Sequence, residues 1–182
     1  MSECVYPSAE NPNNFVFDTN NINRLAVDAI AIEKCKLAIK HGYQFYITDV
    51  QVREFMGVPD RKGTYSDPAS WHTSENLDQI RNLIKNLNIQ HISCVALLLK
   101  HFWTLDGSMR ILDDKGPLFE MFQTIHNNNR SHLRDATIAE ATVYNHCKLV
   151  TNDRRLRNKM NSFFPGSAIT YEDFLDSLNS LN

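Results

Sequence analysis

Short apolar runs alternate with amphipathic stretches along most of this chain. Four runs have the length and composition of buried strands, residues 15–17, 43–47, 91–99 and 149–151, and a further short strand is predicted near residues 168–170. In four further stretches apolar residues recur about every 3.6 positions, which predicts helices: residues 21–41, 73–88, 117–126 and 135–148. Because strands that alternate with helices usually lie parallel, we predict an α/β fold with a central, mostly parallel sheet.

Other segments depart from this alternation. Residues 1–13 are polar and indicate an N-terminal arm, and residues 57–72 are rich in Gly, Pro, Asp and Ser, which predicts a long loop. The dipeptide Asp106-Gly107 favours a tight turn between two short strands. A parallel sheet does not need such a β-hairpin, so we interpret about residues 100–130, the helix after the hairpin included, as an insertion. We expect a single domain over residues 1–182.

Composition excludes several classes of protein. The net charge of −2 excludes a continuous basic surface, so contacts with nucleic acid would have to come from local patches. The four cysteines show no C-x-x-C spacing, and Cys35 and Cys147 fall in predicted helices, so neither zinc nor disulfides are favoured. No apolar run reaches the length of a membrane span and the first residues do not resemble a signal peptide. We therefore expect a cytoplasmic protein with no membrane contact.

Carboxylates recur where predicted elements begin or end. Asp18 ends the first apolar run, and Asp153 follows the run at 149–151. Sites in parallel sheets form outside the carboxyl ends of the strands, so these two residues can meet although they are far apart in sequence. Asp135 heads a helix and lies on its apolar face, while Glu54 belongs to a short helix that follows the second strand. Thr48 and Gln51 predict a capping box at the start of that short helix.

Four carboxylates at one edge of a sheet point to a metal. Gathered carboxylates repel one another and raise each other's pKa values unless a divalent cation neutralises them. Mg²⁺ and Mn²⁺ prefer oxygen ligands and keep several waters, which suits an open cluster. Sites of this kind typically hydrolyse phosphodiester bonds. The sequence therefore predicts a metal-dependent hydrolytic site formed by Asp18, Glu54, Asp135 and Asp153.

At these positions the sequence resembles the PIN-domain ribonucleases. "FVFDTN" with Asp18, "ITDVQVREF" with Glu54, "RDATIAEAT" with Asp135 and "LVTND" with Asp153 match the family's four acidic motifs in order and in element context. The resemblance implies a three-layer α/β/α sandwich and an endoribonuclease that uses Mg²⁺ or Mn²⁺, held by the four acidic residues. It gives supporting polar roles to two residues, Asn20 and Thr151. It leaves open a homodimer, and the toxin of a toxin–antitoxin pair with an antitoxin protein as partner.

Binding of RNA would need positive side chains near the carboxylates. Four arginines flank two of the acidic motifs: Arg130, Arg134, Arg154 and Arg155. We predict that they contact phosphates, and that His132 is the histidine best placed to contact substrate. Basic residues on helices are also commonly solvated, and that alternative stays open for each of them.

Each acidic residue has a plain structural alternative as well. Asp18 and Asp153 could be helix N-caps, Asp135 could complement a helix dipole, and Glu54 could be a solvated helix residue. Glu140 lies about 140° around the helix from Asp135, so we expect it to face solvent or another element. Two functional alternatives also remain: a DNA-cleaving or structure-specific nuclease, and a catalytically degenerate module that only binds.

Overall fold

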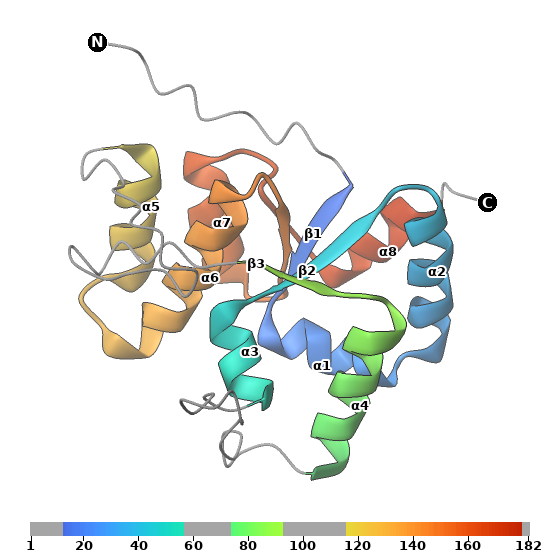
Figure 1. Ribbon diagram of the computed structural model, residues 1–182. Helices are drawn as coiled ribbons and strands as arrows, with labels where there is room; N and C mark the ends of the chain where they lie inside the picture. Colours follow the sequence, from blue (N-terminus) through green and yellow to red (C-terminus); the bar gives the residue numbers. More distant parts are fainter. Residues whose placement is uncertain (1–12, 57–73, 93–115, 180–182) are drawn as a thin grey trace.

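Five parallel strands form a sheet at the centre of the molecule (Figure 1). The computed structural model describes residues 13–56, 74–92 and 116–179. The strands are β1 (Asn14–Phe17), β2 (Gln44–Thr48), β3 (Gln90–Ile92), β4 (Lys148–Val150) and β5 (Ala168–Ile169). They lie in the order β3-β2-β1-β4-β5, and all four neighbouring pairs are parallel. The predicted α/β fold with a parallel sheet is confirmed.

Helices cover both faces of this sheet. The described residues form eight α-helices: α1 (Thr19–Val27), α2 (Ala29–Lys40), α3 (Asp49–Met56), α4 (Ser74–Asn86), α5 (Pro117–His126), α6 (Leu133–Tyr144), α7 (Arg154–Phe163) and α8 (Tyr171–Asn179). Helices α1, α2, α4 and α8 share one apolar core with the sheet, and helices α5, α6 and α7 share the other (Figure 1). The arrangement is a three-layer α/β/α sandwich.

The side chains of β1 alternate between these two cores, as the pleat of a strand requires. Phe15 and Phe17 lie in the first core, where the ring of Phe174 sits with its centroid 5.1 Å from each of theirs. Val16 points to the opposite face and packs in the second core. Burial of each such side chain contributes roughly 1.5–3 kcal/mol. Strand β1 is therefore held from both sides, which fixes the position of the residue that follows it.

The helix predicted over residues 21–41 is in fact two helices, so its predicted length was wrong. Asp28 separates α1 from α2 with an extended backbone (φ −97°, ψ 90°). Its carboxylate accepts a hydrogen bond from Ala31 N at 3.0 Å and so caps α2. Val27 and Ile30, on either side of the break, are 64% and 73% exposed. The apolar pattern continued through this point on residues that do not belong to the core.

Several other predictions can be compared with the structure. Helix α5 has the predicted bounds, and its residues Leu118 and Phe122 are buried in the core that it shares with α6 and α7. Cys147 lies just before β4 and not in a helix, and like Cys35 it is buried with a free thiol. Several predicted segments lie outside the described residues. They are residues 1–12 of the arm, the long loop (57–72), the hairpin around Asp106-Gly107 (102–112) and most of the strand predicted over 91–99.

The described chain also bears on the expectation about membranes. None of its helices is both long enough and apolar enough to cross a lipid bilayer.

The direction of strand addition reverses at β1. The chain proceeds from β1 to β2 and β3 on one side, whereas β4 and β5 lie on the other side. Parallel α/β sheets open a crevice at the carboxyl ends of the strands where such a reversal occurs. The register pairs Phe17 with Val150, so Asp18 and Thr151 come next to each other at this edge. The reversal therefore brings the first and the last predicted motif together.

Candidate active site

Asp18 occupies the centre of the carboxyl edge of the sheet. Its side chain is only 8% exposed. Oδ1 accepts a hydrogen bond from Asn21 N at 2.7 Å, and Oδ2 accepts one from the Thr151 hydroxyl. Burial raises the pKa of Asp18; the two hydrogen bonds lower it, and the negative charges of Asp135 and Asp153 raise it further. Asp18 thus caps helix α1 and also lies within the field of two other carboxylates.

Glu54 is brought to this edge by helix α3. The predicted capping box is confirmed on one side, because Thr48 N donates to the Gln51 side-chain oxygen at 2.9 Å. Gln51 Nε2 also donates to the carbonyl of Phe17 at 2.6 Å, which ties the start of α3 to the end of β1. Glu54 is 7% exposed, so the solvated alternative for this residue is wrong.

The carboxylate of Glu54 has two partners from other elements. Oε2 accepts a hydrogen bond from the Thr19 hydroxyl at 3.0 Å. Oε1 forms an ion pair with Arg134 Nη1 at 2.9 Å. The arginine was predicted to contact substrate phosphates; in the structure it contacts one of the predicted metal ligands.

Asp135 lies in the first turn of helix α6 and is half-buried. Burial raises the pKa of its carboxyl group. The positive charges of Arg134 and His132 lower this pKa, whereas the negative charges of Asp153 and Glu54 raise it. Asp135 is therefore the residue at which the fields of Glu54 and Asp153 overlap.

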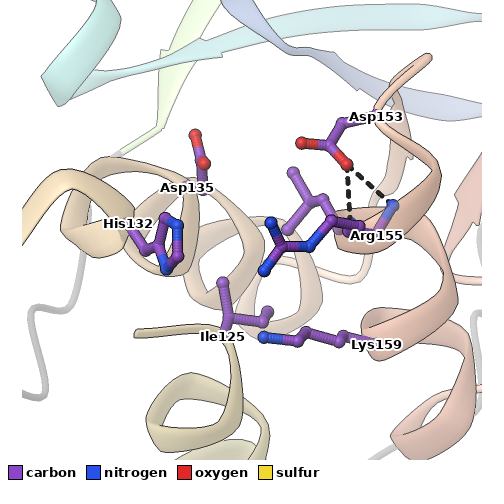
Figure 2. A pocket seen from close by; sticks show the side chains of 7 residues that line it. Ile125, His132, Asp135, Asp153, Arg155 and Lys159 are labelled. Carbon is purple, nitrogen blue, oxygen red and sulfur yellow. Dashed lines mark hydrogen bonds between the residues drawn. The ribbon is translucent and has the colours of Figure 1, made fainter. Parts of the chain in front are cut away.

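Asp153 caps helix α7. Its Oδ1 accepts hydrogen bonds from Arg155 N at 2.7 Å and Leu156 N at 3.0 Å. Figure 2 shows the other carboxylate oxygen directed toward Asp135. The structural alternative, that Asp153 is an N-cap, is correct, and it leaves one oxygen facing the neighbouring carboxylate.

The four predicted acidic residues therefore form one electrostatic cluster. The negative charges of Asp135 and Asp153 raise the pKa of Asp18, and those of Asp153 and Glu54 raise the pKa of Asp135. Within the described ranges, however, no three Asp, Glu, His or Cys side chains stand close enough together to ligate one ion directly. The donor set is made of carboxylate oxygens, which suits Mg²⁺ and Mn²⁺, and these ions keep waters that can bridge to ligands at longer range. The carboxylate oxygens of these four residues are therefore chemically suited to an Mg²⁺ or Mn²⁺ ion.

The two predicted supporting residues differ in their placement. Thr151 donates from its hydroxyl to Asp18, and its hydroxyl oxygen also accepts a hydrogen bond from Asp153 N at 3.1 Å. Asn20 is exposed, whereas Asn21 is 2% exposed and donates from Nδ2 to Val150 O at 3.1 Å. Sequence reasoning missed Asn21. The available signal was its position three residues after a capping aspartate, where the backbone N–H turns back to the cap.

The other predicted arginines differ in their placement. Arg155 lines a hollow with Asp135 and Asp153 (Figure 2). Arg154 is exposed and is not among the residues that line this hollow. Arg130 lies in the short 3-10 helix η1 (Arg130–His132), and its side chain is outside the described part of the structure.

Glu140 does not face solvent. It is fully buried within helix α6, and neither carboxyl oxygen has a hydrogen-bond partner among the described residues. Burial raises its pKa to about 9, so at neutral pH it carries a proton. Of the two surroundings expected for Glu140, solvent or another element, the structure excludes solvent, because α6 is buried on more than one side.

Comparison with known proteins gave no match to a protein-family model, to a curated protein or to a solved structure. The resemblance to the PIN-domain ribonucleases therefore rests on the four acidic motifs alone. What the structure adds is the arrangement of those motifs at one edge of the sheet.

Proposed function

We propose that the protein is a metal-dependent nuclease that hydrolyses phosphodiester bonds, with RNA as its substrate. The observation that carries the proposal is the meeting of Asp18, Asp135 and Asp153 at the point where the strand order reverses. Burial and mutual repulsion raise the pKa values of Asp18 and Asp135, so the fold keeps negative groups where they are unfavourable without a cation. Perturbed carboxylates in a crevice are typical of functional sites.

The residues divide into two roles under this proposal. Asp18, Asp135, Asp153 and Glu54 would hold the divalent ion, directly or through water. When bound, the ion supplies Lewis acidity: it lowers the pKa of a water and stabilises the charge that develops on the leaving oxygen. Thr151 and the backbone N–H of Asn21 fix the orientation of Asp18 through their hydrogen bonds.

We propose RNA rather than DNA as the substrate because the four motifs resemble those of ribonucleases. A partner protein or a second copy of the chain, as in toxin–antitoxin pairs of that family, is compatible with the proposal but is not needed for it. A DNA-cleaving activity would use the same carboxylates, so only the substrate distinguishes these alternatives.

A module that binds without cleaving is the competing proposal, and one observation favours it. The ion pair between Arg134 and Glu54 already neutralises one of the four carboxylates. The single positive charge of an arginine can neutralise one carboxylate, but it cannot activate a water as a divalent ion does. The two proposals therefore differ in whether the cluster takes up a metal.

Cleavage assays test the proposal. Labelled single-stranded and structured RNAs and DNAs are incubated with Mn²⁺, Mg²⁺ or EDTA, using the wild type and Asp135→Asn. We expect RNA to be cut with either ion, to stay intact in EDTA, and to stay intact with Asp135→Asn. Asp78→Asn is the matched control, because it removes a carboxylate from an exposed helix position and should cut as the wild type does. Intact RNA with the wild type, together with no Mn²⁺ binding by calorimetry, would contradict the proposal.

A further inference from the structure

A hollow opens beside the carboxylates, between helices α5, α6 and α7 (Figure 2). Asp135 and Asp153 line one part of it, and three basic side chains line another: His132, Arg155 and Lys159. The hollow measures about 50 Å³, the space of a few water molecules, so it suits a compact polar group. Acidic and basic groups thus lie next to each other around one small space.

The basic side chains are available to a ligand in different ways. Arg155 is exposed, and Figure 2 shows its guanidinium reaching into the hollow with the His132 ring and Lys159 beside it. Lys159 Nζ donates one hydrogen bond, to Thr124 O at 2.7 Å, and an ammonium has three protons to donate. The Nδ1 atom of His132 is buried and has no hydrogen-bond partner among the described residues.

The basic character of the hollow comes from side chains and not from the N-terminus of helix α7. Two backbone N–H groups in the first turn of that helix, those of Arg155 and Leu156, already donate to the Asp153 carboxylate. An anion in the hollow would therefore be bound by side chains. Arginine and lysine side chains are the groups that proteins commonly use to bind phosphate.

We propose that this hollow binds a phosphate group of the nucleic-acid substrate, next to the phosphate that is cleaved, with Arg155 and Lys159 as its main ligands and His132 as an additional donor. The proposal rests on the proposed nuclease function and adds a subsite to it. In this arrangement the cleaved phosphate lies at the carboxylates, and the neighbouring phosphate lies against the basic side chains. The nucleic-acid strand therefore runs from the carboxylates to the basic side chains. Both an internal phosphodiester and a terminal phosphate have this chemistry.

The test combines a charge removed from the protein with a charge removed from the substrate. Single-stranded RNAs carry a neutral methylphosphonate at one position at a time, or lack their 5′-phosphate. Affinity is measured by fluorescence anisotropy with Ca²⁺ as the divalent ion, for the wild type, Arg155→Ala, Lys159→Gln and Arg154→Ala. Arg154 is the matched control, because it is the neighbour of Arg155 on α7 but does not line the hollow.

For the wild type we expect one phosphate position at which neutralisation weakens binding about tenfold, the size of one charge-assisted contact. Arg155→Ala should weaken binding of the unmodified strand by a similar factor and should abolish the effect of that one modification. Lys159→Gln should reduce the same effect. Arg154→Ala should leave the effect of that one modification unchanged, whatever it does to overall affinity, because Arg154 does not line the hollow. If the sensitive position is the 5′-phosphate, the ligand is a chain end; if it is internal, the ligand is a phosphodiester.

Two results would overturn the subsite. One is a methylphosphonate effect of equal size in the wild type and in Arg155→Ala, and the other is Arg154→Ala behaving like Arg155→Ala. Failure of the nuclease function is a separate result, because it appears as intact RNA in Mn²⁺ whatever the binding pattern.

Discussion

The two ends of helix α1 carry the same residue in different surroundings. Asp18 precedes the helix and accepts a hydrogen bond from the N–H three residues on, and Asp28 follows it and does the same for α2. Asp18 is 8% exposed and lies in the field of two further aspartates, whereas the second hydrogen bond to Asp28 comes from a neutral group, the hydroxyl of the buried Tyr171, at 3.4 Å. Capping explains a carboxylate at either end. It does not explain why other carboxylates gather at one of them.

The largest expected effect is a difference in RNA cleavage between variants of Asp18 and Asp28. Asp18→Asn should lower RNA cleavage about a thousandfold, or ~4 kcal/mol in transition-state stabilisation, because it removes a proposed metal ligand. Asp28→Asn changes the same residue at the same kind of helix cap and should stay within about twofold of the wild type. Equal losses in the two variants would show that capping alone, and not the cluster, accounts for Asp18. Cleavage rates in Mn²⁺ provide the comparison.

A second prediction concerns a carboxyl group that neither caps a helix nor joins the cluster. The pKa of Glu140 is raised from its ordinary value of 4.5 to about 9, so the folded protein holds a proton that the unfolded chain releases. The free energy of unfolding should therefore fall as pH rises from about 4.5 to about 9. Glu140→Gln removes this loss and should stabilise the protein by roughly 3 kcal/mol at pH 7.

Urea denaturation of Glu140→Gln and the wild type at several pH values tests this. The difference in unfolding free energy should shrink toward zero near pH 4.5. A difference of the same size at pH 4.5 and pH 8 would mean that a proton is not involved.

A third prediction concerns stability at the two ends of α1 in the absence of metal. Burial raises the pKa of Asp18, so its charge destabilises the folded state above its ordinary pKa of 3.8 and not below it. In EDTA at pH 7, Asp18→Asn should therefore raise the unfolding free energy by about 1 kcal/mol, since asparagine still caps the helix. Asp28→Asn should change it by less than about 0.5 kcal/mol. Loss of stability in Asp18→Asn would contradict the electrostatic account.

The smallest expected effect concerns Arg134. Its charge lowers the pKa of Asp135, so Arg134→Gln should raise that pKa and leave less of the carboxylate ionised at low pH. We expect cleavage a few-fold below the wild type at the acidic end of the pH profile, with recovery as the pH rises. Arg134→Lys keeps the charge and should follow the pH profile of the wild type. Identical profiles for Arg134→Gln and the wild type would show that the charge of Arg134 does not influence Asp135 in the active protein.

The edge at which the carboxylates meet could be predicted from sequence. Asp18 and Asp153 each follow an apolar run, and the strand-end rule for parallel sheets places such residues together without further information. The capping box of Thr48 and Gln51 was also visible, because its signal lies within four residues. These features depend on local order along the chain and on one general rule of topology.

The features that could not be predicted from the sequence depend on how the helices pack. The pair of Arg134 and Glu54 joins residues 80 positions apart and follows from the approach of α6 to α3. The sequence left open whether Glu140 faces solvent or another element, because an apolar pattern on one face does not show that residues 136–142 of α6 are all buried. The break at Asp28 was hidden by Val27 and Ile30, which are apolar yet exposed. Hydrophobic character predicts burial only on average.

The position of β4 beside β1 also determines when the site can form during synthesis. The backbone N–H of Asp18 bonds to the carbonyl of Val150 at 3.1 Å, and the Asp18 carboxylate depends on the Thr151 hydroxyl. These partners leave the ribosome more than a hundred residues after Asp18, and such distant pairings form late in folding. A nascent chain would therefore carry the first carboxylate without its neighbours. Under the proposed function, an enzyme that cuts RNA would in this way be made, on a machine built largely of RNA, without a working site until most of the chain has emerged.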